Sequence, residues 1–93
     1  MRVKYFEWDP DKNEVLRSGR GISFEEITFH IMQGDLLDVL EHPNVERYAG
    51  QKIFIVRVND YVYLVPFVEG DHSVFLNTII PSRKATARYL KDE

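Results

Sequence analysis

The sequence predicts an α+β domain in which a four-stranded antiparallel sheet is covered on one face by two N-terminal helices and one C-terminal helix. Three observations predict it. Two helix-capping signatures stand within the first 26 residues, β-branched runs follow at residues 53–58 and 61–68, and a serine-capped basic segment closes the chain. The resulting order α, α, β, β, β, β, α with consecutive hairpins gives an antiparallel sheet.

The first helix is predicted by the signals at its two ends. Asp9 can cap the free backbone N–H groups of a helix start, and Pro10 suits the first helical position, where no N–H is needed. The helix runs from there to Arg17. The segment 18–21 then ends it, because its two glycines permit left-handed backbone.

The second helix carries the clearest local signature in the chain. Ser23 and Glu26 form a capping box, in which each side chain accepts a hydrogen bond from the backbone N–H of the other. Gly34 is placed to end this helix. Its apolar stripe, which is expected to pack on the sheet, consists of Phe24, Ile27, Phe29 and Ile31.

Four strands are predicted after this helix, at residues 35–41, 53–58, 61–68 and 74–80. The first also fits a helical turn, and the strand is favoured because glycine precedes it and a His-Pro-Asn turn follows it. The second and third form a hairpin around Asn59 and Asp60, a two-residue loop that tolerates positive φ. Pro66 cannot donate to a strand ladder and is expected at a bulge or on an unpaired edge. Arg57 is expected to be exposed at the hairpin end rather than to point into a cleft.

The composition limits the kind of protein. Ninety-three residues with 44% hydrophobic and 29% charged side chains fit one globular domain. The chain has no cysteine, which excludes disulfides and thiolate metal sites. No stretch approaches the roughly 20 apolar residues of a membrane span, and the N-terminus contains no signal-peptide core. We therefore expect a cytoplasmic protein that does not enter the membrane.

Positive charge is concentrated near the C-terminus. The net charge of −3 argues against tight non-specific binding of nucleic acid, since lysine and arginine supply most of that affinity. The predicted helix 83–91, capped by Ser82, nevertheless carries Arg83, Lys84, Arg88 and Lys91 and no acid. Cations at a helix start oppose the helix dipole, so the first two indicate a phosphate site. The alternative is an ordinary solvated helix face.

Other catalytic and cofactor motifs are absent from the sequence. His30, His42 and His72 have no spacing that brings two of them to one metal ion, so no metal site is expected. His30 is expected to be structural. His42 lies beside Glu41, which can hold its imidazole protonated near neutral pH, and is either functional or a turn residue. No glycine-rich phosphate loop exists, so no nucleotide cofactor is indicated.

Three segments resemble, in the same order, landmarks of the BrnT toxins. They are Phe6-Glu7-Trp8-Asp9-Pro10 with Lys12 and Asn13, then Ile22-Ser23-Phe24-Glu25-Glu26, then Ile79-Ile80-Pro81-Ser82-Arg83-Lys84-Ala85-Thr86. The resemblance implies a RelE/ParE-like fold and the toxin component of a bacterial type II toxin–antitoxin system. Such a toxin is a metal-independent endoribonuclease that inhibits translation and is neutralised by a cognate antitoxin.

The resemblance also implies partners and residue roles. The substrate would be RNA, including ribosome-associated mRNA, and toxin and antitoxin would form a hetero-oligomer. Basic side chains would stabilise charge on the phosphate during attack by the ribose 2′-hydroxyl, and aromatic side chains would stack bases. Arg83 and Arg47 would contact phosphate and Glu46 would act as the base, while Trp8 and Lys12 would bind RNA.

Together with the residues argued above, the catalytic candidates are Arg83, Arg47, Glu46 and His42. The RNA-binding candidates are Lys84, Arg88, Lys12 and Trp8.

Two alternative functions stay open at this point. The apolar central hairpin and the acidic net charge fit a non-catalytic module that docks another protein through an exposed aromatic face of Tyr61, Tyr63 and Phe67. A non-nuclease toxin of the ParE type, which poisons gyrase, shares the superfamily fold. Fold alone does not distinguish these functions.

Overall fold

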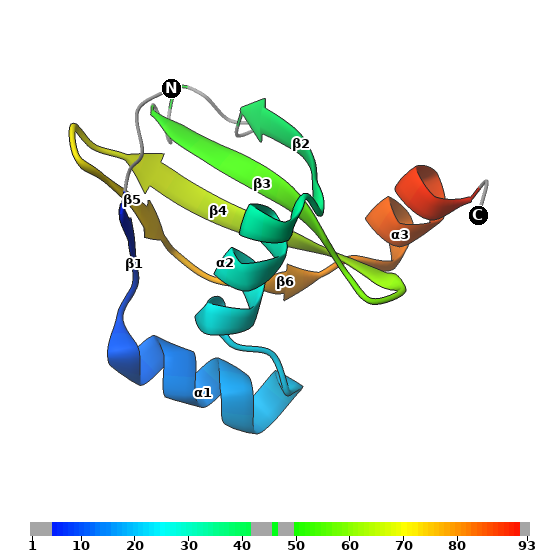
Figure 1. The fold of residues 1–93 in the computed structure, drawn as a ribbon, viewed down its shortest axis with the longest axis horizontal. Coiled ribbons are helices and arrows are strands. Elements are labelled where there is room, and N and C mark those ends of the chain that lie inside the picture. The colour runs from blue at the N-terminus through cyan, green and yellow to red at the C-terminus, as the bar shows by residue number, and fades with distance from the viewer. Residues whose placement is uncertain (1–4, 42–45, 47–49, 92–93) are drawn as a thin grey trace.

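The computed structural model, described for residues 5–41, 46 and 50–91, contains three helices and a six-stranded sheet (Figure 1). The strands are β1 (Tyr5–Glu7), β2 (Leu36–Glu41), β3 (Gln51–Val58), β4 (Tyr61–Glu69), β5 (Ser73–Leu76) and β6 (Ile80–Pro81). The helices are α1 (Pro10–Arg20), α2 (Phe24–Gln33) and α3 (Arg83–Leu90). The sheet order is β1-β5-β4-β3-β2, with β6 paired to β4, and only the β1–β5 pair is parallel. The predicted α+β class is confirmed.

The prediction of four strands is wrong in two places. β1 has only three residues, too few to show an alternating pattern, and it becomes a strand by pairing with β5 at the sheet edge. The predicted strand 74–80 is split into β5 and β6. Between them, the N–H of Asn77 donates to the carbonyl of Pro66 at 2.8 Å, and the side chain of Ile79 is fully buried. The chain leaves the ladder there because Ile79 packs into the core.

The first helix begins where expected and ends later. Asp9 accepts a hydrogen bond from the backbone N–H two residues on, at 2.9 Å. α1 then continues past Arg17, and Gly19 lies inside it. Only Gly21 adopts the left-handed conformation that ends the helix, with φ of 72°. The predicted end was three residues early. The segment contains two glycines, either of which can adopt a positive φ, and the sequence does not tell which one does.

The capping box of the second helix is confirmed. Ser23 Oγ accepts from the N–H of Glu26, and Glu26 Oε1 accepts from the N–H of Ser23, each at 3.2 Å. Gly34 ends α2 with φ of 104°. Ile27 is fully buried as expected, whereas Phe29 is 61% exposed on the outer side of the helix, so its place in the packed stripe was wrong.

Helices cover both faces of the sheet, which corrects the prediction of one covered face. α1 and α2 pack on the face that holds the main core, which consists of Leu16, Ile22, Phe24, Ile27, Phe54, Val56, Val58, Val65, Phe67, Val74, Leu76 and Ile79. Successive strand residues point to opposite faces, so Ile55 and Val62 lie on the other face, where both are buried. α3 packs on β4 and shares a groove with Ile55 (Figure 1). We call this second face the open face.

The β3–β4 hairpin is confirmed, with Asn59 at a positive φ of 59°. Pro66 lies in the interior strand β4 and pairs with Ile53 without a register break, so the expected bulge is absent. Val58 and Tyr61 flank the two-residue loop, and this register turns the nitrogen of Pro66 away from β3. That nitrogen points between the ends of β5 and β6, where β4 has no paired neighbour. The missing N–H therefore costs no ladder bond.

Candidate nucleic-acid interface

The basic helix α3 begins at a hydrogen-bonded junction with β4. Ser82 caps the helix as predicted, its Oγ accepting from the N–H of Ala85 at 3.0 Å. The N–H of Ser82 donates to the carbonyl of Val62 at 3.1 Å. The N–H of Val62 donates to Thr86 Oγ1 at 2.9 Å, and that hydroxyl donates to the carbonyl of Ser82 at 2.7 Å. The sheet thus fixes the start of α3 and the position of Arg83.

A groove with a volume of about 190 Å³ lies between α3 and the open face. Leu40, Ile55 and Leu64 line it from three neighbouring strands, and Lys84 and Arg88 line it from α3. The two cations are one helical turn apart, as the spacing predicted. The sequence did not predict the three apolar residues, because it does not tell which face of the sheet α3 covers. The groove places positive charge beside apolar surface.

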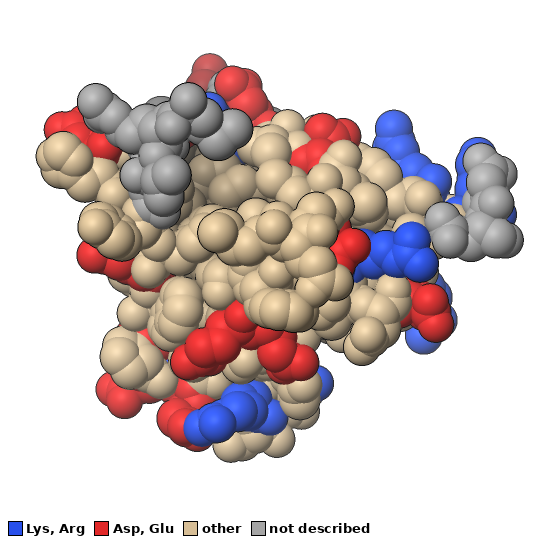
Figure 2. Space-filling model, viewed as in Figure 1, with Lys and Arg blue, Asp and Glu red and all other residues tan. Residues whose placement is uncertain are grey.

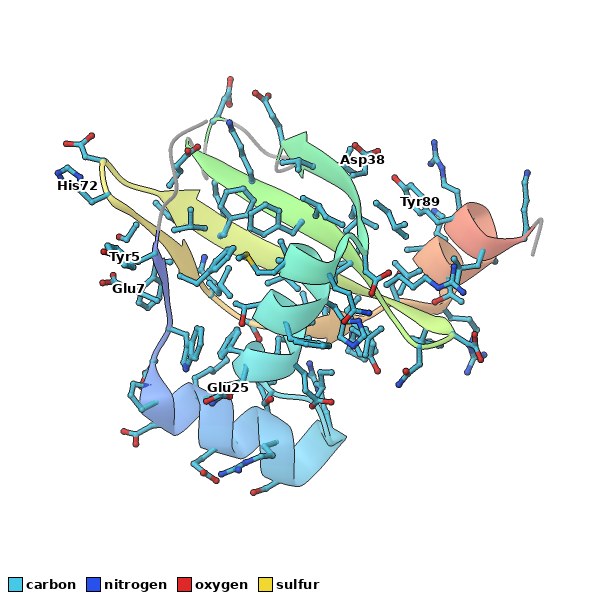
Figure 3. All side chains as sticks on the ribbon, in the orientation of Figure 1. Tyr5, Glu7, Glu25, Asp38, His72 and Tyr89 are labelled. Atoms are coloured by element: carbon cyan, nitrogen blue, oxygen red, sulfur yellow. The ribbon has the colours of Figure 1, made fainter. Side chains whose placement is uncertain are left out.

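Tyr89 ties α3 to the edge strand β2. Its hydroxyl donates to Asp38 Oδ2 at 3.0 Å, and Figure 3 shows the two side chains facing each other between β2 and α3. Partial burial, followed by the hydrogen bond and the charge of Asp38, raises the pKa of Tyr89 above the usual 10.0. The hydroxyl therefore stays a donor at neutral pH. No local pattern signals this contact between residues 51 positions apart.

A second recess, of about 380 Å³, lies between α3 and the β3–β4 hairpin; it is lined by Arg57, Asp60, Thr86, Ala87, Leu90 and Lys91. The Arg57 side chain is 31% exposed, its Nε donates to the carbonyl of Asn59 at 3.0 Å, and its Nη2 lies 3.9 Å from Asp60 Oδ1. The expected exposure at the hairpin end is only partial, because the hairpin loop folds back on the guanidinium group.

The positive charge of α3 is not balanced by any acidic residue within the helix. Arg83, Lys84 and Arg88 are exposed, and no carboxylate of the described residues lies within ion-pair distance of them. Figure 2 shows a group of lysine and arginine side chains at the α3 end, whereas acidic side chains gather over α2 and the far end of the sheet, and both charges are mixed over α1. The field at α3 therefore favours a polyanion, although the net charge of the chain is negative.

Two RNA-binding candidates lie away from α3. Trp8 is half-buried and stacks on Phe24, with ring centroids 5.6 Å apart and an interplanar angle of 22°. Lys12 is exposed on α1 and lines a recess with Arg20. Figure 1 shows α1 and α3 well separated. The structure therefore brings Arg83, Lys84 and Arg88 together but leaves Trp8 and Lys12 at another surface.

The other catalytic candidates fall in the connection between β2 and β3. Glu46 is an exposed turn residue. His42 and Arg47 lie outside the described residues. The geometry of these three relative to Arg83 therefore stays a prediction.

His30 has the structural role that was expected. Its Nδ1 lies 2.7 Å from Asp35 Oδ2, and the Asp35 N–H donates to the His30 carbonyl at 2.9 Å. The Asp35 carbonyl accepts from the N–H of Arg57, also at 2.9 Å. This chain of contacts joins the C-terminal end of α2 to β3.

The aromatic face expected for a docking module is not formed. Phe67 is buried and stacks on Phe54, with ring centroids 3.8 Å apart. Tyr61 and Tyr63 are half-buried, with ring centroids 5.6 Å apart. All four side chains belong to strand positions that face α2 or the hairpin end, so the sheet leaves no exposed aromatic row there.

Comparison with known proteins identifies no relative, since no family model, curated protein or solved structure matches the chain. Within the part of the chain that the structure describes, no three His, Asp or Glu side chains are grouped so that they could hold a metal ion. None of the helices described is both long and apolar enough to cross a membrane. The surface of α3 and the sequence resemblance therefore carry the functional argument.

Proposed function

We propose that this chain is the toxin component of a type II toxin–antitoxin system, a metal-independent endoribonuclease of the BrnT type with a RelE-like fold. It would inhibit translation by cutting RNA and be neutralised by a cognate antitoxin. The observation that supports this most is the group of exposed cations on α3: Arg83, Lys84 and Arg88. A polyanion is the natural partner of such a surface.

The third BrnT-like segment supports the same proposal by elimination. Ile79 is fully buried, Ser82 caps α3, and Thr86 bonds to β4, so each of these has a task in the fold. Arg83 and Lys84 are exposed, and neither has an ion pair within the described chain. Their positions at a helix start bring no local stability. Binding of a negatively charged ligand would explain why Arg83 and Lys84 stand at these positions.

The proposed reaction is a transesterification within the RNA and uses no second substrate. The ribose 2′-oxygen forms a bond to phosphorus while the bond to the 5′-oxygen breaks, which leaves a 2′,3′-cyclic phosphate and a 5′-hydroxyl. A base, Glu46 in this proposal, takes the 2′ proton, and the leaving 5′-oxygen takes a proton from water. Arg83 stabilises the negative charge that grows on the phosphate oxygens. Lys84 and Arg88 hold the neighbouring backbone.

The test is induced expression in bacteria that lack the neighbouring gene, with total RNA analysed from each culture. We expect the wild type to arrest growth and to produce fragments with 5′-hydroxyl and cyclic phosphate ends. Extracts should give the same fragments in the presence of a chelator. Arg83→Ala should lower cleavage about 100-fold or more, the typical effect of removing one charge-stabilising donor.

A matched control separates this effect from a change of net charge. Arg17 is an exposed arginine on α1 that pairs with Glu14, so Arg17→Ala removes the same charge far from α3. It should arrest growth like the wild type. Circular dichroism would confirm that both variants are folded. Arrest and cleavage by folded Arg83→Ala at the wild-type rate would overturn the proposed role, and arrest with intact RNA would favour a ParE-type toxin.

The alternative function is a non-catalytic binding module. It is favoured by the apolar side chains on the open face, where Val68 and Phe75 are partly exposed to solvent. Harmless expression of a folded wild type, with no RNA cleaved, would make this alternative the better one.

A further inference from the structure

The open face carries an apolar surface that continues across β2, β3, β4, β5 and β6. The pairing of the strands shows which residues belong to this surface, because residues opposite each other in a sheet point to the same side. Leu40 lies opposite Ile53, which lies opposite Pro66, and Val68 lies opposite Phe75. With Ile80 opposite the groove residue Leu64, the surface consists of Leu40, Ile53, Pro66, Val68, Phe75 and Ile80. We call it the apolar patch.

The apolar patch is only partly covered. α3 lies over Ile55 and Leu64 at one end of the face. Leu40, which lines the groove beside α3, is 42% exposed, and Val68, Phe75 and Ile80 are 40 to 43% exposed. Sheets normally bury an apolar face against a second layer, and contiguous apolar patches of this kind mark interaction surfaces. The patch therefore fits a partner that lies flat on the sheet.

Strand addition at the edge of the sheet fits less well than packing on its face. The edge strand β2 has a register irregularity between Leu36 and Asp38. The Asp38 carboxylate also accepts a hydrogen bond from the N–H of Val39 at 2.8 Å, which occupies a donor that an added strand needs. Bulges and occupied donors of this kind protect edges from pairing.

The two ends of the open face carry opposite charges. At one end, Lys84 and Arg88 of α3 outnumber the carboxylate of Asp38, so the charge there is positive. At the other end, Glu7 of β1 lies opposite Phe75 and therefore points to the open face. Figure 3 shows Glu7 and Tyr5 at the opposite end of the sheet from Tyr89. A second copy turned by 180° places its cations over Glu7 of the first, and the reverse contact forms at the same time.

We propose that two copies of this chain associate through their open faces in a two-fold dimer, with α3 of each protomer over β1 of its partner. Phe75 and Val68 fill the centre of the interface, as buried anchors do in stable dimers. Packed sheets lie about 10 Å apart, so both apolar patches leave water together. An acidic partner of another kind matches only the α3 end, whereas a second copy matches both ends.

The dimer itself does not depend on the proposed function, but one consequence rests on it. Lys84 and Arg88 face the second copy in the dimer and RNA in the proposed nuclease. The two partners therefore compete for these residues, and the dimer is the closed form of the RNA site.

The experiment is sedimentation equilibrium of the purified full chain over a range of concentrations. The wild type should sediment at twice the 11.0 kDa of one chain. Phe75→Lys should weaken association about 100-fold or more, as expected when a central aromatic anchor becomes charged. Phe29→Lys is the matched control, because Phe29 is also an exposed phenylalanine but lies on the outer side of α2. It should remain dimeric.

Charge reversal tests the orientation. Glu7→Lys and Arg88→Glu should each weaken the dimer, and the combined variant should recover most of the loss. A wild type that is monomeric at all concentrations, or a Phe75→Lys variant as dimeric as the control, overturns the dimer. So does a monomeric wild type in which Phe75→Lys abolishes binding of the neighbouring gene product, which would assign the patch to that protein. If the combined variant does not recover dimer affinity, the arrangement with α3 over β1 of the partner is overturned. None of these results depends on RNA cleavage.

Discussion

Single residues explain why two of the three BrnT-like segments occur together. The Asn13 Nδ2 group donates to Glu25 Oε1, and its Oδ1 accepts from the N–H of Phe24, both at 2.8 Å. Trp8 of the first segment stacks on Phe24 of the second. These contacts lock α1 against the start of α2. The first two segments are therefore accounted for by the fold, which leaves function to the third.

Glu25 gives a pH-dependent prediction at the same scale. The hydrogen bond from Asn13, and then that from its own backbone N–H, lowers the pKa of Glu25 below its usual 4.5. A pKa that is lower in the folded state adds stability that is fully present above pH 4.5 and is lost as the pH falls through the folded-state pKa. Because Glu25 is exposed, solvent screening keeps this contribution small.

We expect Glu25→Gln, which keeps an acceptor but removes the charge, to lower the free energy of unfolding at pH 7 by less than about 1 kcal/mol. The difference from the wild type should shrink as the pH falls below 4.5 and through the lower folded-state pKa. Urea denaturation of both proteins at pH 7 and at a series of acid pH values measures it. A difference that does not change with pH would contradict the assignment.

At the scale of elements, the end of α1 shows how two nearby glycines take different tasks. Gly19 is helical, whereas Gly21 has a φ of 72°. A Cβ atom added at either position meets no atom within 4 Å, so packing does not distinguish them. Only backbone conformation does.

The two alanine substitutions should therefore have effects of opposite sign. Gly19→Ala should stabilise the protein by roughly 0.5 to 1 kcal/mol, because alanine loses less backbone entropy in a helix. Gly21→Ala should destabilise it by about 1 to 2 kcal/mol, the cost of left-handed backbone for a residue with a Cβ atom. Thermal unfolding measures both, and shifts of the same sign would show that α1 ends elsewhere.

At the scale of the whole molecule, the proposed binding of RNA by an acidic protein depends on where its charges lie. In the proposed function, the basic surface of α3 would attract the phosphate backbone, while the acidic side chains over α2 and the far end of the sheet would repel it (Figure 2). Binding is thereby restricted to one end of the molecule. The number of phosphate contacts should then be small.

The salt dependence of binding tests this restriction. Each phosphate contact contributes a slope of about −0.7 to the plot of log affinity against log salt for single strands. Contacts from Arg83, Lys84 and Arg88 predict a slope of about −2, which should fall in magnitude to about −0.7 for the Lys84→Ala, Arg88→Ala double variant. Arg17→Ala should leave it unchanged. A slope in the double variant equal to that of the wild type would place the RNA site elsewhere.

Sequence reasoning predicted the parts of this protein that depend on neighbours in the chain. Ser23, Ser82 and Asn59 stand at the cap and turn positions that were expected, because a cap or a two-residue loop needs only a few adjacent residues. The α+β class and the basic α3 followed from the same local patterns. The positions of Lys84 and Arg88 on one helical face followed from spacing alone.

Tertiary structure decided the parts that depend on distant pairing. β1 forms because β5 lies beside it, and the groove between α3 and the open face forms because α3 crosses to that face. The hydrogen bond between Asp38 and Tyr89 joins residues 51 positions apart. The alternating pattern of a strand indicates which residues share a face. It does not indicate which helix covers that face. That choice is made by the burial of Ile79 and by the junction of Ser82 and Thr86 with β4, which turn α3 onto the face opposite α2.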